Sequence, residues 1–65
     1  MTRRRNPRSR HQRAVRELGG VRIAERAEQL RALGVEPGEV ATLLGVELDA
    51  VQRYYTFQDA LAGAA

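Results

Sequence analysis

The sequence predicts an all-α protein in which a basic, partly helical N-terminal arm precedes a core of three helices. Three segments carry apolar residues at intervals of three or four, the spacing of an amphipathic helix, and glycines separate these segments. No segment alternates apolar and polar residues as a half-buried strand does, and no Asn-Gly pair marks a hairpin. With 65 residues, the chain has room for one small core.

The charged residues divide the chain into two parts. Residues 1–16 contain seven arginines and no acid, a net charge of +7, whereas residues 17–65 contain four arginines and eight acids, a net charge of −4. The seven arginines of the first part are Arg3, Arg4, Arg5, Arg8, Arg10, Arg13 and Arg16. We therefore expect an arginine-rich arm at 1–20, a helical domain at 21–62 and a tail at 63–65 that frays.

The arm is expected to be helical only in its second half. Residues 1–7, MTRRRNP, offer almost nothing to a core and end in proline, so we expect them to be disordered. From 8 to 18, His11, Ala14 or Val15, and Leu18 recur at helical spacing, and two glycines end the segment. His11, surrounded by arginines, is expected at the surface.

Residues 21–33 have the most regular helical pattern in the sequence. Their apolar stripe consists of Ile23, Ala27, Leu30 and Leu33, with Ala24 beside it. Gly34 follows and is expected to cap the carboxyl end of the helix.

Two further helices are expected at 37–44 and at about 48–62. Pro37 suits the first turn of the former, because its missing N–H would be unpaired there, and Gly45 ends it. In the latter, Val51 and Tyr54 face inward, whereas the adjacent Tyr55 points about 100° away and is expected at the surface. Phe57 and Leu61, with Val15 and Leu18, either pack the arm helix against the last helix or form a dimer seam.

The connection between these two helices has the features of a helix-turn-helix. Such a turn needs a small residue where the helices cross, an apolar residue at the end of the first helix, a residue that accepts a left-handed backbone, and an apolar residue after it. The sequence supplies these in order as Ala41, Leu44, Gly45 and Val46.

The segment EVATLLGVELDAVQRYY resembles the helix-turn-helix superfamily, in which a helix ending apolar-Gly-apolar precedes a recognition helix reading Val-x-Arg-aromatic. With residues 21–33 it resembles the three-helix core of small bacterial and phage regulators, over residues 21 to about 61. The resemblance implies a double-stranded DNA-binding protein, a transcriptional regulator or a DNA-handling accessory, associated with the nucleoid in the cytoplasm. Helix 48–62 would lie in the major groove.

The resemblance assigns base contacts to exposed residues of that helix. They are Asp49, Gln52, Arg53 and Thr56. Glutamine pairs bidentately with adenine and arginine with guanine or a phosphate, so Gln52 and Arg53 are the main candidates. Glu47 and Asp49 depart from the Ser or Thr more usual in the superfamily, and we expect them to cap the helix; a contact between either acid and a cytosine amino group is the rarer alternative.

The arm arginines are expected to bind the DNA backbone. Neutralising about four to six phosphates would supply most of the affinity through counterion release. In homeodomains, segments such as RRRNPR also enter the minor groove beside a helix-turn-helix. The alternative to DNA binding by the arm is that it binds any polyanion, RNA included.

Other function classes lack their residues. There is no cysteine, one histidine and a single serine in the arm, so we expect no metal, no cofactor, no small-molecule substrate and no enzymatic activity. No apolar run approaches the roughly 20 residues of a membrane span.

Two alternatives to a regulator stay open. The acidic body favours an interaction module that keeps the helix-turn-helix shape but docks on a polymerase, a repressor or a phage structural protein, with the arm binding nucleic acid non-specifically. A nucleic-acid-coating peptide would explain the arginines but not the turn at Gly45. A homodimer is attractive for so small a core.

Overall fold

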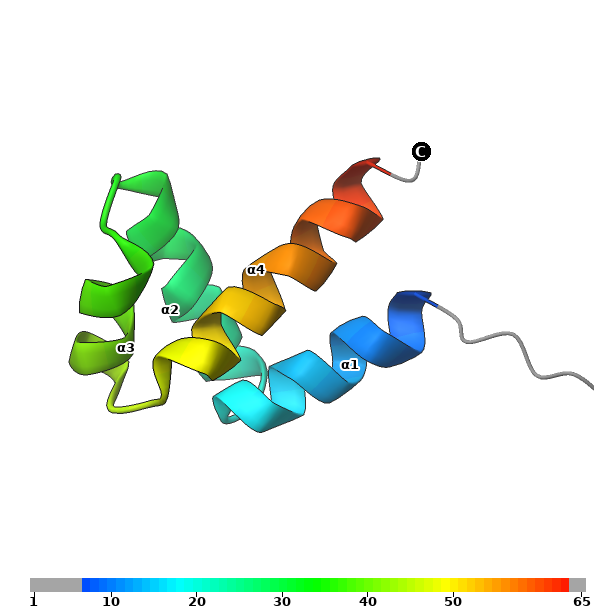
Figure 1. Ribbon diagram of the computed structural model, residues 1–65, viewed down its shortest axis with the longest axis horizontal. Coiled ribbons are helices and arrows are strands. Elements are labelled where there is room, and N and C mark those ends of the chain that lie inside the picture. Colours follow the sequence, from blue (N-terminus) through cyan, green and yellow to red (C-terminus); the bar gives the residue numbers. More distant parts are fainter. Residues whose placement is uncertain (1–6, 64–65) are drawn as a thin grey trace, which may run out of the picture.

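The computed structural model describes residues 7–63, and four helices make up most of this part of the chain (Figure 1). The helices are α1 (Pro7–Leu18), α2 (Val21–Ala32), α3 (Pro37–Leu44) and α4 (Leu48–Gly63), and the described residues form no strand. The all-α class is therefore confirmed. Disorder was expected for 1–7, but Pro7 begins α1. The rest of that expectation, for 1–6, falls outside the described part, as do the phosphate contacts of Arg3, Arg4 and Arg5 and the fraying of 64–65.

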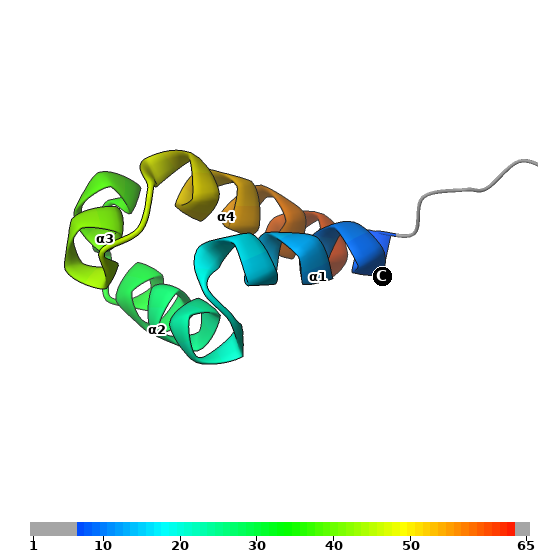
Figure 2. The same ribbon diagram turned by 90° about the horizontal axis from the view of Figure 1, so that it is seen from below.

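Helix α1 belongs to the packed body of the protein. It lies antiparallel beside α4, its most extensive neighbour, and both views show the two helices side by side (Figures 1 and 2). Ala14 and Leu18 of α1 are each 1% exposed, and Val15 and Phe57 pack against the core from its edge. Leu18, Val15 and Phe57 thus show the first of the two roles left open, the packing of the first helix against the last, and the dimer seam stays a prediction.

The core is small and built largely from short side chains. Its buried members are Ala14 and Leu18 of α1, Ala24 and Ala27 of α2, Val40 and Ala41 of α3, and Val51, Tyr54 and Tyr55 of α4. Four of these residues are alanines, which allow the helix backbones to approach closely, and the two tyrosines are the largest side chains among them.

Tyr55 corrects the expectation from the sequence, which placed it at the surface. It is 6% exposed, and its hydroxyl donates a hydrogen bond of 2.9 Å to the backbone oxygen of Ala27. Because Ala24 and Ala27 carry only a methyl group, α2 leaves room for both adjacent tyrosines of α4. Helical spacing within α4 does not reveal this space, since α2 provides it.

Two other residues differ from the expectation. Leu33 is 78% exposed, because α2 ends at Ala32; the chain turns at Gly34, and Val35 packs against the core instead. His11 is half-buried rather than at the surface, with its ring 5.5 Å from that of Tyr54 and its Nε2 hydrogen-bonded to Gln58.

The turn between α3 and α4 follows the sequence closely. Gly45 has a left-handed backbone (φ 68°, ψ 34°), and the N–H of Val46 donates to the carbonyl of Ala41 at 3.0 Å. This bond reaches back five residues, as in a Schellman end, and satisfies a carbonyl that the helix leaves unpaired. The turn sets α4 at a steep angle to α3 (Figure 1).

Candidate nucleic-acid interface

The four residues assigned to base contacts share one exposed face of α4. Asp49, Gln52, Arg53 and Thr56 are all exposed, whereas Val51, Tyr54 and Tyr55 on the other side of the helix are buried. Intervals of three and four residues place these four side chains along one side of a helix. The first half of α4 therefore has a solvent-exposed surface that a ligand can contact.

Arg53 is not free on this face, because it pairs with an acid of α1. Its Nη1 donates to Oε1 of Glu17 at 2.8 Å, and the two side chains are 51% and 40% exposed. The hydrogen bond that Arg53 donates to this carboxylate, and the charge of the carboxylate, raise the pKa of Arg53 above its ordinary value, so the guanidinium stays charged. Because 36 residues separate Arg53 from Glu17 in the sequence, the pattern of neighbouring residues does not predict this pair.

The remaining residues of the face differ in how they are held. The Thr56 hydroxyl donates to the carbonyl of Gln52, one turn earlier in the same helix, at 2.9 Å. Within residues 7–63, the side chains of Asp49 and Gln52 have no hydrogen-bond partner. The Gln52 amide is therefore available to a ligand without breaking an internal contact.

The two acids near the start of α4 do not cap it by hydrogen bonds. Neither the Glu47 nor the Asp49 carboxylate bonds to a backbone N–H of the described chain, although the Glu47 carbonyl accepts from Ala50 and Val51. The expected capping is limited to the first-turn charge of Asp49, which complements the helix dipole.

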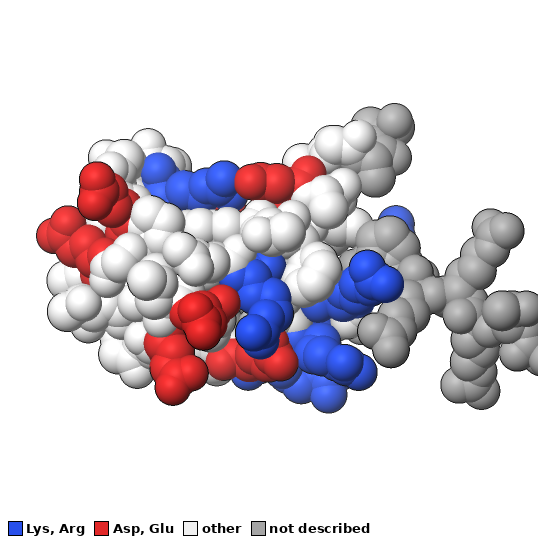
Figure 3. All heavy atoms as spheres, viewed as in Figure 1, with Lys and Arg blue, Asp and Glu red and all other residues white. Residues whose placement is uncertain are grey.

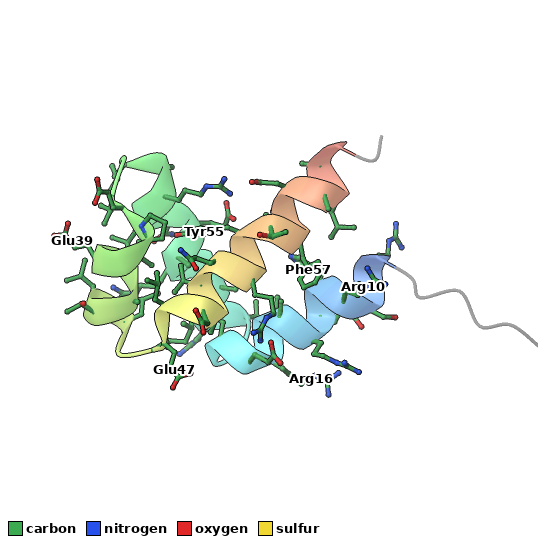
Figure 4. All side chains as sticks on the ribbon, in the orientation of Figure 1. Arg10, Arg16, Glu39, Glu47, Tyr55 and Phe57 are labelled. Atoms are coloured by element: carbon green, nitrogen blue, oxygen red, sulfur yellow. The ribbon has the colours of Figure 1, made fainter. Side chains whose placement is uncertain are left out.

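Arginines of α1 meet the same face of α4 along a groove between the two helices. The groove has a volume of about 470 Å³ and is lined by Arg10, Arg13, Ala14, Glu17, Arg53 and Phe57. Figure 4 shows Phe57 between the two helices, with Arg10 at the same end of the molecule. Two arginines assigned to phosphates and one assigned to bases therefore line a single surface.

Not every arm arginine lines this groove. Arg16 is exposed and lines a separate hollow with His11 and Val15, on the side of α1 toward the start of α2. Figure 4 shows Arg16 pointing away from α4. Arg8 is exposed in the first turns of α1.

Charge is distributed unevenly over the surface. In Figure 3, arginines gather over α1 and its border with α4, whereas acidic side chains gather over α3 and the start of α4. The acids on either side of the α3–α4 turn are Glu36, Glu39, Glu47 and Asp49. Two large apolar side chains beside this turn are also exposed to solvent, Leu43 by 61% and Leu48 by 41%. Positive charge is thus concentrated on the α1 side, and the turn offers an acidic and apolar surface.

A second ion pair joins α4 to α2, away from the groove. Arg31 donates from both Nη atoms to the two carboxylate oxygens of Asp59, each at 2.8 Å, and its guanidinium lies 4.5 Å from the centre of the Tyr55 ring. The hydrogen bond from Arg31 lowers the pKa of Asp59. The sequence interval of 28 residues again explains why the sequence alone did not indicate this pair, which is structural.

Other kinds of site find no support in the described residues. In the part of the chain from 7 to 63, no three side chains of His, Asp or Glu gather as metal ligands would. None of the helices described there has the length and apolar character needed to cross a membrane. The chain matches no model of a known protein family, and comparisons with curated proteins and with solved structures find no similar protein.

Proposed function

We propose that this chain is a small double-stranded DNA-binding protein, acting as a transcriptional regulator or a DNA-handling accessory on the nucleoid. Helices α2, α3 and α4 would form its helix-turn-helix core, with α4 in the major groove and the arginines of the arm on the backbone. One observation carries the proposal: Arg53, on the face assigned to bases, lines the same groove as Arg10 and Arg13, which are assigned to phosphates.

The arrangement suits a duplex because bases and phosphates must be contacted together. A major groove about 12 Å wide admits one helix, and the phosphates line its edges. Arg10 and Arg13 of the neighbouring helix line the groove beside Arg53 of α4, which supports the proposal that they contact phosphates along one such edge. Phosphate contacts of this kind fix register and orientation, and base contacts supply specificity.

Each residue of the α4 face has a role in this proposal. Gln52, whose amide has no partner within the described chain, is the candidate reader of adenine. Arg53 reads guanine, Thr56 contributes a hydroxyl or methyl contact, and Asp49 accepts from a cytosine amino group. Phosphate and minor-groove contacts fall to Arg3, Arg4, Arg5, Arg8, Arg10, Arg13 and Arg16.

A second candidate function is supported by the surface around the α3–α4 turn. Glu47 and Asp49 would face the phosphates if the start of α4 entered a groove first, and the exposed Leu43 and Leu48 offer apolar surface beside them. Acidic and apolar surface of this kind fits a basic protein partner. The chain would then be an interaction module with an arm that binds nucleic acid of any sequence.

Enrichment of bound sequences from a random duplex pool, followed by a gel shift over a salt series, tests the proposal. A DNA-binding regulator yields a preferred sequence whose complex survives competitor DNA. An interaction module with a basic arm yields binding that is lost by about 0.2 M salt and no preferred sequence. Absence of duplex binding even at about 50 mM salt would contradict both functions.

A further inference from the structure

Glu17 occupies an unusual position in the groove between α1 and α4. It is the one acid among the residues that line the groove, next to Arg10, Arg13 and Arg53. Its carboxylate bonds to Arg53 and to neither of the other two arginines, which have no acidic partner within the described residues. A negative charge at this place weakens the attraction of the groove for phosphate, so phosphate binding alone does not explain the presence of Glu17.

We propose that Glu17 is a specificity-determining residue, which directs Arg53 toward base edges by withdrawing it from phosphates. The inference rests on the proposed function, since it concerns how the same surface discriminates between DNA sequences. Glu17 itself touches no base. It acts through the orientation and local charge of Arg53.

The charges explain how one carboxylate achieves this. A guanidinium that already holds a carboxylate forms a pair of zero net charge, so its pull on a phosphate is weak, and Glu17 repels a phosphate placed beside it. The acceptors on a guanine edge carry no full charge and suffer little from this repulsion. Hydrogen bonds from Arg53 to O6 and N7 of guanine therefore stay favourable while a backbone contact does not.

The geometry leaves Arg53 able to bind a base while the ion pair is intact. A guanidinium has five N–H donors, and the contact with Glu17 uses Nη1. The Arg53 side chain is 51% exposed, and within the described residues its other guanidinium nitrogens make no hydrogen bond. Fixing the side chain before binding also reduces the conformational entropy lost on complex formation.

The alternative is that the pair only ties α1 to α4. Both side chains are about half exposed, and ion pairs of that kind contribute little to stability. The packing of Ala14 and Leu18 already holds α1 against the core. Removal of a mere tie would change thermal stability slightly at most, and it would not alter how the protein distinguishes sequences.

The test compares Glu17→Gln with Glu39→Gln in the full chain. Both variants gain one unit of charge, but Glu39 lies on α3 at the end of the molecule opposite Arg10 (Figure 4). Binding is measured on a random duplex and on the sequence enriched by the wild type, over a salt series. We expect Glu17→Gln to bind the random duplex more tightly, with a salt slope steeper by about 0.9, the value of one added phosphate contact.

The preference for the enriched sequence should fall by about tenfold in Glu17→Gln and stay near the wild-type value in Glu39→Gln. A second pair of variants tests whether Glu17 acts through Arg53. In an Arg53→Gln background, Glu17→Gln should no longer change the preference, because the group through which it acts is gone. Thermal unfolding checks that each variant is folded.

The possible failures are distinguishable. If the wild type binds no duplex, the proposed function and this inference fall together. If the wild type binds but shows no preferred sequence, the regulator function and this inference are again both wrong, and the interaction module is supported. If the wild type has a preferred sequence but Glu17→Gln and Glu39→Gln retain equal preference, only the inference about Glu17 is wrong. It is also wrong if Glu17→Gln has the same effect with and without Arg53.

Discussion

The hydroxyl of Tyr55 donates a hydrogen bond of 2.9 Å to the backbone oxygen of Ala27, which joins the middle of α4 to the middle of α2 inside the core. The guanidinium of Arg31 lies over the same ring, 4.5 Å from its centre, and continues to Asp59 through two hydrogen bonds. The buried face of α4 is thereby fixed against α2, and this leaves the opposite face, with Gln52 and Arg53, directed at solvent.

Tyr55→Phe should lower the stability of the protein without changing its fold. The variant keeps the ring and the contact with Arg31 but loses a buried hydrogen bond, which contributes about 1 kcal/mol. For a domain of this size we expect the Tm to fall by about 4–8 °C in thermal unfolding. Tyr54→Phe is the matched control, since no residue of the described chain accepts or donates a hydrogen bond at its hydroxyl. Equal Tm values for the two variants would contradict the role assigned to Tyr55.

The protein should lose stability at alkaline pH through its two tyrosines, the only ones in the chain. Burial raises the pKa of Tyr54 to about 12 and also raises the pKa of Tyr55. Since the folded-state pKa exceeds the unfolded value of about 10, the stabilisation is complete below about pH 10 and is lost as pH rises through about 12.

Chemical denaturation between about pH 9 and pH 12, with Tyr54→Phe as comparison, measures this loss. The variant should lose less stability over this range than the wild type. Tyrosinate absorbance provides an independent check. An ionisation midpoint near pH 10 for both tyrosines in the folded protein would show that neither hydroxyl is shielded as the structure describes.

Gly45→Ala and Gly38→Ala should change stability in opposite directions. Gly45 has a left-handed backbone, and a Cβ there would meet no atom within 4 Å, so the penalty of about 1–2 kcal/mol comes from the backbone alone. Gly38 lies inside α3, also with nothing within 4 Å of a Cβ, and alanine there should stabilise by about 0.5 kcal/mol. Denaturant unfolding of both variants measures the difference; a destabilised Gly38→Ala together with an unaffected Gly45→Ala would refute it.

Arg13→Gln should weaken binding to all DNA sequences alike. Arg13 lines the groove beside α4, and loss of one phosphate contact reduces the salt slope by about 0.9. Arg22→Gln removes the same charge from α2, where Arg22 lines a hollow with Glu25 and Gln29, and should leave the slope nearly unchanged. Identical slopes for the two variants would mean that net charge, and not the groove, governs attraction.

Gln52→Ala should instead change the sequence preference. A bidentate contact with adenine contributes about 1–3 kcal/mol of discrimination, which would disappear at one position of the enriched sequence while the salt slope stays constant. Gln29→Ala, an exposed glutamine of α2, serves as control. Enrichment experiments with both variants measure the effect, and an unaltered preference in Gln52→Ala would remove this residue from the interface.

Much of the helical framework was predictable because its signals are local. The expected helix at 37–44 was observed at Pro37–Leu44, with proline in its first turn and glycine at its end. The helices expected at 21–33 and 48–62 shifted by one residue at their carboxyl ends, to Ala32 and Gly63. The exposure of Gln52 and Arg53 followed from the burial of Val51 and Tyr54, since the two sets occupy opposite sides of one helix.

The candidate site was predictable only in part. Its residue types and their common face could be derived from the spacing within α4, but the meeting of Arg53 with Arg10 and Arg13 could not, because no spacing rule relates α4 to α1. Glu17 gave no signal in the sequence, where it stands as one acid after a run of arginines.

By itself, the sequence determined where helices begin and end to within one residue, where the backbone must turn at Gly45, and which charges belong to the two halves of the chain. Those properties depend on neighbours within about five residues. The tertiary structure alone decided that α1 joins the core, that Tyr55 is buried, and that Glu17 holds Arg53. These outcomes depend on residues far apart in the sequence, 28 residues for Tyr55 and Ala27 and 36 for Arg53 and Glu17. Their proximity is set by how closely the helices, with alanines between them, approach each other.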